Sequence, residues 1–143
     1  MKLNIKEISI YKGKNVEILD IFKYKLINMY TYKAEILKII DGDTIKLNID
    51  LGFRTFIVAN CRIFGVNAPE NNSKDEEIKL KADEAKDWVE NELFIGQIVT
   101  IYSKKLDKYG RPLVILEYNM GCKILSLAEE LLKNGLAIKL EYK

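Results

Sequence analysis

The chain has 143 residues, of which 48% are apolar and 31% charged, and it carries only 2 prolines. This composition is typical of a soluble globular domain and excludes a collagen-like, disordered or membrane-embedded chain. The sequence has no histidine, which excludes catalytic Ser–His and Cys–His pairs and histidine-bound zinc. With 23 basic and 21 acidic residues the net charge is only +2, so a site for a polyanion has to be local.

The first 28 residues differ from the rest of the chain. They carry six lysines against three acidic residues, and two short β-prone runs flank the turn-forming residues 12–15. We therefore expect residues 1–28 to form a β-hairpin that extends a main domain of residues 29–143. The protein is expected to be a monomer, with the unpaired edges of this hairpin as the alternative route to a dimer or to a protein partner.

The cysteines and the N-terminus bear on the cellular location. Cys61 and Cys122 are too few for a disulfide framework, so both are expected to be free thiols. Lys2, Lys6 and Glu7 interrupt the N-terminal apolar run, which is unlike a secretory signal. No stretch reaches the ~18 apolar residues of a membrane-spanning helix. These features predict a cytoplasmic protein with no membrane partner.

Three strands are predicted after the extension. Residues 32–38 and 45–49 alternate apolar and polar side chains on either side of the turn Asp41-Gly42, as the paired strands of a hairpin do. Leu51-Gly52 then turns the chain into Phe53–Val66, a long run rich in β-branched and aromatic residues. The three strands should form a meander.

A helix is predicted next, because apolar residues recur at the spacing of one helical face. Ser73 and Glu76 are read as a capping box before this helix, and Gly96 as its stop. The residues of the apolar face are Ile78, Ala82, Ala85 and Val89.

The remaining pattern completes the expected fold. Residues 97–103 and 112–118 are predicted strands joined by the polar turn 104–111, and a last helix runs from a capping box at Ser126 to Asn134-Gly135. The order is β-β-β-α-β-β-α. A helix between the third and fourth of five strands is typical of a Greek-key barrel of the OB type, so the predicted fold class is mainly β with α.

Three segments carry charged residues at positions where the apolar core of a barrel would not be expected to have them. In Ile40-Asp41-Gly42-Asp43-Thr44, two carboxylates flank a glycine and could hold a hard cation, although Asp-Gly is also a common turn dipeptide. Arg62 interrupts an apolar strand and needs an anionic partner, which can be a structural carboxylate or a substrate phosphate. The segment Asp107-Lys108-Tyr109-Gly110-Arg111 presents two cations and an aromatic ring, and is also a plausible solvated turn.

Taken together, the three segments indicate a chemistry. With Glu70, which follows Pro69 at the exit of the third strand, they supply oxygen ligands, two guanidinium groups and a lone carboxylate. This set is sufficient for metal-assisted hydrolysis of a phosphodiester without histidine.

With these motifs in this order, and with Asn134-Gly135-Leu136-Ala137 near the end, residues 30–142 resemble the staphylococcal (micrococcal) nuclease family. The resemblance implies an OB barrel and calcium-dependent hydrolysis of DNA and RNA. It implies that Asp43 is the main metal carboxylate and that Asp41 lies just outside the direct ligands of the ion. By the same resemblance, Arg62 and Arg111 are the two catalytic arginines, Glu70 is the general base, and Tyr109 lies where the family contacts substrate. We expect its neighbour Lys108 to bind substrate as well.

One position departs from the family. The family usually has an aspartate, a second metal carboxylate, where this chain has Asn67. The amide oxygen of Asn67 and the backbone carbonyl of Ala68 can still bind a hard cation, but one negative charge is lost. We therefore expect a divalent cation, calcium first with magnesium or manganese as alternatives, bound more weakly than in the family.

Two functions are carried forward. The first is a metal-dependent endonuclease whose substrate is DNA, RNA or both. The alternative is a noncatalytic OB-fold module that binds single-stranded nucleic acid through aromatic residues such as Tyr102, Tyr109 and Tyr118. A binding module has no need for the four residues that match the catalytic and metal-binding set of the family, which favours the enzyme.

Overall fold

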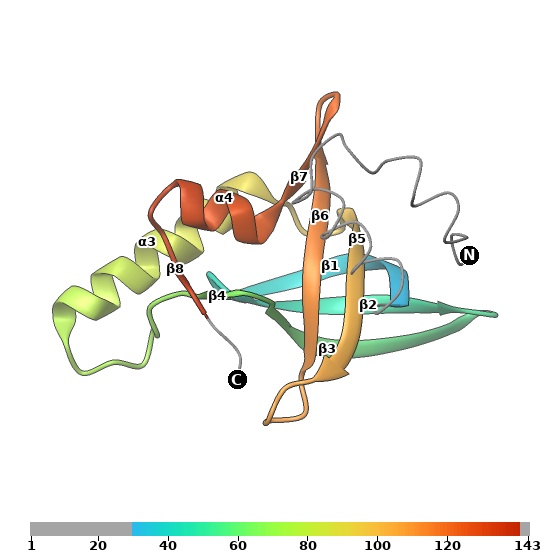
Figure 1. The fold of residues 1–143 in the computed structure, drawn as a ribbon, viewed down its shortest axis with the longest axis horizontal. Helices are drawn as coiled ribbons and strands as arrows, with labels where there is room; N and C mark the ends of the chain where they lie inside the picture. The colour runs from blue at the N-terminus through green and yellow to red at the C-terminus, as the bar shows by residue number, and fades with distance from the viewer. Residues whose placement is uncertain (1–29, 141–143) are drawn as a thin grey trace, which may run out of the picture.

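The computed structural model describes residues 30–140, without the side chain of Lys104. This part of the chain is mainly β with two helices, which confirms the predicted fold class (Figure 1). The hairpin expected for residues 1–28 lies outside the described residues. Within the described range, neither helix has the length and apolar character that crossing a bilayer would require.

Six strands form one sheet that closes on itself. Their order is β3-β2-β1-β5-β6-β7, and an additional parallel pairing of β3 with β6 closes the ring, with Arg62 opposite Leu113 and Ile63 opposite Val114. The other pairings in this sheet are antiparallel, so β1, β2 and β3 form the predicted meander. The strands are β1 (Tyr30–Asp41), β2 (Thr44–Gly52), β3 (Thr55–Ile63), β5 (Ile98–Leu106), β6 (Pro112–Met120) and β7 (Lys123–Ser126).

Side-chain alternation along the strands fills the barrel. The pairing of β2 with β3 is regular from Thr44 opposite Arg62 to Asp50 opposite Phe56, so every second residue of β3 faces the same way. Cys61 and Ile63 are fully buried in the core, whereas Arg62 belongs to the opposite face of the strand. In β1, a register shift between Ile36 and Lys38 changes the alternation, and Ile39 rather than Lys38 enters the core.

The long third strand predicted for Phe53–Val66 is wrong at both ends. Phe53 and Arg54 form the turn after β2, with positive φ angles of 54° and 63°, so β3 begins only at Thr55. At the other end a turn at Gly65, with φ of 87°, separates β3 from the short strand β4 (Val66–Asn67). β4 pairs with β8 (Ile138–Lys139) in a separate two-stranded sheet. A turn inside a continuous apolar run leaves little trace in the hydrophobic pattern.

Helix α3 (Glu76–Glu92) presents Ala82, Ala85 and Val89 to the interior, as predicted, and packs against β1. Ile78, assigned to the same face, is 41% exposed, so the predicted face is wrong at this residue. The capping residue is Asp75 rather than Ser73: an Asp75 side-chain oxygen accepts from the backbone N–H of Glu77 at 2.9 Å. Helix α3 ends at Glu92, before the turn that contains Gly96.

The C-terminal part adds elements that the pattern did not predict. Strand β7 continues the sheet beyond β6 and leads directly into helix α4 (Leu127–Lys133). Ser126 occupies the N-cap position of α4, but its side chain makes no capping hydrogen bond, so the predicted capping box is absent. Leu127 and Leu131 bury the inner face of α4, and Asn134 and Gly135 end the helix as expected.

Candidate active site

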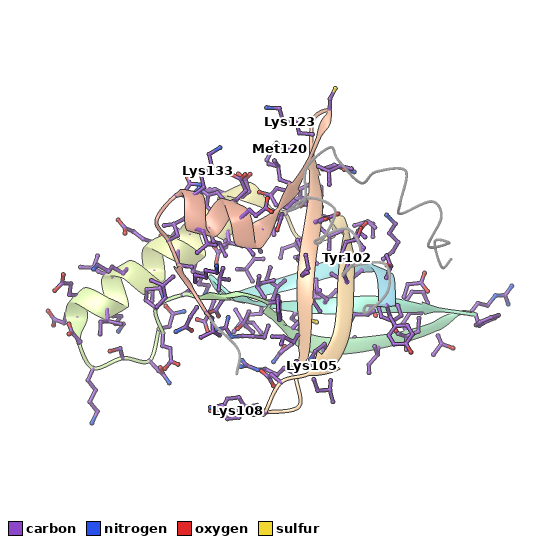
Figure 2. The ribbon with its side chains drawn as sticks, viewed as in Figure 1. Tyr102, Lys105, Lys108, Met120, Lys123 and Lys133 are labelled. Carbon is purple, nitrogen blue, oxygen red and sulfur yellow. The ribbon has the colours of Figure 1, made fainter. Side chains whose placement is uncertain are left out.

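The fold brings the predicted site residues together. They come from the end of β1 and the turn that follows it, the end of β3, β4 and the segment after it, and the loop between β5 and β6. Most of them line one cavity of about 330 Å³: Asp41, Asp43, Arg62, Asn67, Ala68, Glu70 and Arg111. The other two, Tyr109 and Lys108, line an adjoining cleft of about 430 Å³ that shares Arg62, Asn67, Glu70 and Arg111. Figure 2 shows Lys108 at the end of the β5–β6 loop.

The β1–β2 turn packs closely against its neighbours at Gly42, and this packing fixes its position. A Cβ atom on Gly42 would lie 2.9 Å from the Cβ of Ala85 in α3 and 3.2 Å from the Cβ of Ala68. Only glycine therefore lets the turn pack directly against both the helix and the segment after β4. The backbone oxygen of Asp43 also accepts from the N–H of Ile63 at 2.8 Å, which fixes the turn to the end of β3.

Asp43 is the most tightly held acidic residue of the cavity. It is 7% exposed, and its Oδ2 lies 2.8 Å from Arg62 Nη1 and accepts from the backbone N–H of Ala68 at 2.7 Å. Its Oδ1 accepts from the Thr44 hydroxyl at 3.0 Å. The anionic partner of Arg62 in this structure is thus a protein carboxylate at the wall of the cavity.

Arg62 also reaches the residue that replaces the expected aspartate. Its Nη2 donates to Asn67 Oδ1 at 2.9 Å, while its Nη1 contacts Asp43. One guanidinium group therefore bridges Asp43 and Asn67, and their side-chain oxygens lie within reach of a common partner. The side chains of Arg62 and Asp43 are 12% and 10% exposed, so their ion pair is shielded from bulk water, whereas the hydrogen bond to Asn67 is exposed.

Asp41 has a partner that the sequence did not suggest. The side-chain Nδ2 of Asn71 donates a short hydrogen bond to Asp41 Oδ1, and Asn71 lines the same cavity. Burial, followed by the negative charge of Asp43, raises the pKa of Asp41 above its ordinary value, although the Asn71 hydrogen bond opposes this. The Oδ1 of Asn71 is buried and is the single such side-chain atom without a partner among the described residues. Asn71 follows Glu70 in a polar loop, and no spacing or motif marked it.

The loop between β5 and β6 is organised by Asp107. One of its oxygens accepts from the backbone N–H groups of Tyr109 and Arg111, and the other accepts from Arg111 Nε at 2.8 Å. Burial would raise the pKa of Asp107, but these hydrogen bonds outweigh it and lower the pKa below its ordinary value. The Arg111 guanidinium lies 5.4 Å from the centre of the Tyr109 ring, so the loop holds Arg111 from two sides.

Glu70 is exposed at the rim and lines both the cavity and the adjoining cleft. In residues 30–140, its carboxylate accepts no hydrogen bond and forms no ion pair, unlike that of Asp43. It is thus the carboxylate of the cavity whose oxygens are accessible to a water molecule or a ligand.

The donor set fits a hard cation only if amide oxygens take part. No three acidic or cysteine side chains among the described residues come together as a metal-binding cluster. The cavity instead offers the carboxylates of Asp41 and Asp43 and the amide oxygens of Asn67 and Asn71. Calcium takes carboxylate, amide and backbone oxygens and completes its shell with water, so these residues fit such an ion.

Two aromatic residues that a binding module would use are not available for stacking. Tyr118 is 2% exposed, and its hydroxyl donates to Glu92 Oε1 at 2.8 Å. The hydroxyl of Tyr102, which is half-buried, donates to Glu117 Oε2 at 3.2 Å. Of the three tyrosines considered for that alternative, only Tyr109 is exposed.

A comparison with protein families decides the relationship of the chain. The model described as staphylococcal nuclease homologue matches residues 60–143, more than half of the chain. The chain belongs to this family. The match includes Arg62, Asn67, Glu70 and Arg111, so the resemblance read from the motifs is confirmed, whereas Asp43 precedes the matched range.

The chain is also similar in sequence to several curated proteins. The chain is 28% identical over 117 residues to Endonuclease Htp3 of Saprolegnia parasitica, an alignment that covers 75% of this chain and 55% of the relative. It is 29% identical over 130 residues to an uncharacterized protein of Bacillus anthracis, covering 89% and 56%. A probable endonuclease LCL3 of Nakaseomyces delphensis is 36% identical over 86 residues, covering 59% and 32%. The chain spans about half the length of the first two.

Proposed function

We propose that this staphylococcal nuclease homologue is a divalent-cation-dependent endonuclease that hydrolyses the phosphodiester bonds of DNA, RNA or both. The observation that carries the proposal is the convergence of Asp43, Arg62, Glu70 and Arg111 on one cavity. These residues come from four separate elements of the fold, and a barrel that only bound nucleic acid would have no need to assemble them. The names of the relatives support the same class of reaction.

The two arginines act on the phosphate. Arg62 and Arg111 line the cavity from β3 and from the β5–β6 loop, so a phosphate bound there meets a guanidinium from each. Attack on a phosphodiester gathers negative charge on its oxygens, and guanidinium groups stabilise that charge more than the single charge of the ground state. Asp107 preorganises Arg111 through Nε and leaves its two Nη groups without hydrogen-bond partners in the described chain.

Glu70 is assigned to the proton of the attacking water. Its exposed carboxylate, which no described residue engages, can accept a hydrogen bond from a water molecule and then its proton. Tyr109 and Lys108 line the adjoining cleft and are assigned to the rest of the substrate, Tyr109 through its exposed ring and Lys108 through its charge.

The cation site is assigned to Asp43, with the side chain of Asn67 and the backbone carbonyl of Ala68 as further ligands. Asp41 is next to this site and adds negative charge. A divalent ion bound there would polarise the scissile phosphate and lower the pKa of a bound water. Calcium is our first choice because the donors are all oxygens, and magnesium or manganese are the alternatives.

Residues 1–28 are proposed to be an extension of a nuclease domain of residues 29–143. The support is that β1, which begins at Tyr30, is a central strand of the closed sheet, between β2 and β5. The domain therefore has to include it, although the family match begins only at residue 60.

Cleavage assays on the full chain test the proposed function. Plasmid DNA, single-stranded DNA and RNA are incubated with calcium, magnesium, manganese or a chelator, and we expect cleavage that the chelator abolishes. Arg111→Ala should lower kcat by about 10²- to 10³-fold, the effect of removing one transition-state donor. Arg54→Ala, in the exposed β2–β3 turn, is the matched control and should cleave like the parent. Binding without cleavage under every metal would favour the binding module instead.

A second variant tests the assignment of the base. Glu70→Gln keeps the size and hydrogen-bonding ability of the side chain but cannot take a proton, so kcat should fall by about 10²- to 10⁴-fold with little change in substrate binding. Cleavage at the parent rate would show that Glu70 has no role in the chemistry, even if the protein is a nuclease.

A further inference from the structure

The unpartnered oxygen of Asn71 is the feature that the proposed function leaves unexplained. Its Oδ1 is buried with no hydrogen-bond donor, while Nδ2 of the same carboxamide donates to Asp41. A buried carbonyl oxygen without a partner is unfavourable, and native structures keep few of them. Asn71 lines the cavity that contains Asp41 and Asp43, so a cation bound there is a candidate for the missing partner.

Asn67, which stands where the family has a second metal carboxylate, is a poor cation ligand in this structure. Asn67 brings no charge, and its Oδ1 is already taken by Arg62 Nη2 at 2.9 Å. A cation at Asp43 that used Asn67 would have to compete with a guanidinium for this oxygen. Asn71 Oδ1 meets no such competition, because no described residue donates to it.

We propose that Asn71 is a ligand of the divalent cation, binding through Oδ1 beside Asp43 and compensating for the oxygen that Arg62 holds at Asn67. The inference rests on the proposed function, since it concerns the same cation site. The carboxamide can serve both neighbours at once. Nδ2 keeps its hydrogen bond to Asp41, while Oδ1 on the other side of the same carboxamide binds the cation. Neutral amide oxygens are ordinary calcium ligands.

A competing explanation is that Asn71 only positions Asp41 through the Nδ2 hydrogen bond. Both explanations predict weaker cation binding when Asn71 is lost, so affinity alone does not separate them. The number of water molecules on the bound ion does, because a lost protein ligand is replaced by water, whereas a lost positioning contact leaves the ligand count unchanged.

The experiment uses the full chain with Ca²⁺ in calorimetric titrations and Tb³⁺, a luminescent calcium analogue, as a second probe. Luminescence lifetimes in H₂O and D₂O count the waters bound to Tb³⁺. We expect Asn71→Leu to weaken Ca²⁺ binding about 10- to 100-fold, the range for loss of a group that supports a metal, and to add about one water to Tb³⁺. Asn71→Asp keeps an oxygen and adds charge, so the water count should stay at the parent value and affinity should rise.

Asn91→Leu makes the same change at an exposed position of α3 and is the matched control, with parent-like values expected for both probes. Circular dichroism checks that each variant is folded, and if Asn71→Leu is not, Asn71→Asp and Asn71→Ser carry the test. An unchanged water count in Asn71→Leu, or weaker binding in Asn71→Asp, would overturn the proposal.

Asp43→Ala separates this inference from the function on which it rests. If Asp43→Ala abolishes Ca²⁺ binding while Asn71→Leu changes neither affinity nor water count, only the role of Asn71 is wrong. If the parent binds no Ca²⁺ or Tb³⁺, or if Asp43→Ala binds like the parent, the proposed cation site itself is wrong and the role of Asn71 fails with it.

Discussion

Replacing Gly42 with alanine tests how the turn that carries Asp41 and Asp43 is held in place. The backbone of Gly42 is outside the left-handed region, so alanine meets no conformational obstacle there. Space is the obstacle, since the new Cβ would lie 2.9 Å from Ala85 Cβ and 3.2 Å from Ala68 Cβ. Neither methyl can rotate away, so the turn, α3 or the segment after β4 has to move.

The magnitude follows from two opposing effects. Overpacking costs about 1–3 kcal/mol, and the stiffer unfolded chain of an alanine variant offsets about 0.4–1 kcal/mol. The difference between these two effects spans about 0–2.6 kcal/mol, and because neither methyl can rotate away we expect Gly42→Ala to lower the free energy of unfolding by about 1–2 kcal/mol. Urea unfolding followed by circular dichroism in the presence of EDTA measures this without a contribution from cation binding.

A double-mutant cycle with Ala85→Gly assigns the cost to the contact. Ala85→Gly alone should cost about 1 kcal/mol through helix propensity. In the double variant the 2.9 Å contact is gone, so the combined loss should be smaller than the sum by about 0.5–1.5 kcal/mol. Parent-like stability of Gly42→Ala, or additive losses in the cycle, would refute the packing argument.

The remaining predictions concern three polar contacts. Asp107→Asn should lower cleavage about tenfold or more because Arg111 loses its ionised partner. It should also reduce the pH dependence of stability. Folding lowers the pKa of Asp107, so its contribution to the free energy of unfolding is complete above the unfolded pKa of about 3.9 and is lost as the pH falls through the folded pKa. Urea midpoints measured from pH 7 to pH 2.5 would show this loss. Tyr118→Phe removes a 2.8 Å hydrogen bond to the carboxylate at the end of α3 and should cost about 1–2 kcal/mol in urea unfolding, whereas an unchanged midpoint would contradict this. Arg62→Ala leaves the buried carboxylate of Asp43 without its guanidinium partner and should lower the free energy of unfolding by about 1–3 kcal/mol in EDTA. The loss should be smaller when calcium is added, and equal losses in both conditions would argue against a calcium ion at Asp43.

The sequence predicted the parts of the fold that depend on local alternation and helical spacing. The meander of β1, β2 and β3 and the buried face of α3 are confirmed because each satisfies a simple period. The closing pair of β3 with β6 follows only from the fold class, since Arg62 and Leu113 are far apart in the chain. The strands β4 and β8 were missed because two residues are too short to show any period.

The candidate site was predicted as a set of residue types, but its internal contacts were not. Side chains at Asp43, Arg62 and Arg111 carry recognisable chemistry, and the fold brings them to one cavity. Which atoms meet depends on tertiary packing, so the bridge from Arg62 to both Asp43 and Asn67 appears only in three dimensions. Asn71 was missed for the same reason: an asparagine in a polar loop is ordinary until its neighbours are known.

The regular register of β3 has a consequence for how this strand tolerates change. From Ala59 to Ile63 the odd-numbered side chains face the barrel interior and the even-numbered ones, Arg62 included, face away from it. Suppose that one residue is inserted or deleted early in this strand and that the strand still pairs with β2 from Thr55 onward. Every later side chain then changes face, so Arg62 would point into the barrel and Cys61 and Ile63 would point outward. Point substitutions at the even positions other than Arg62 leave the core untouched, so those positions should accept replacement more readily than the strand accepts a change of length.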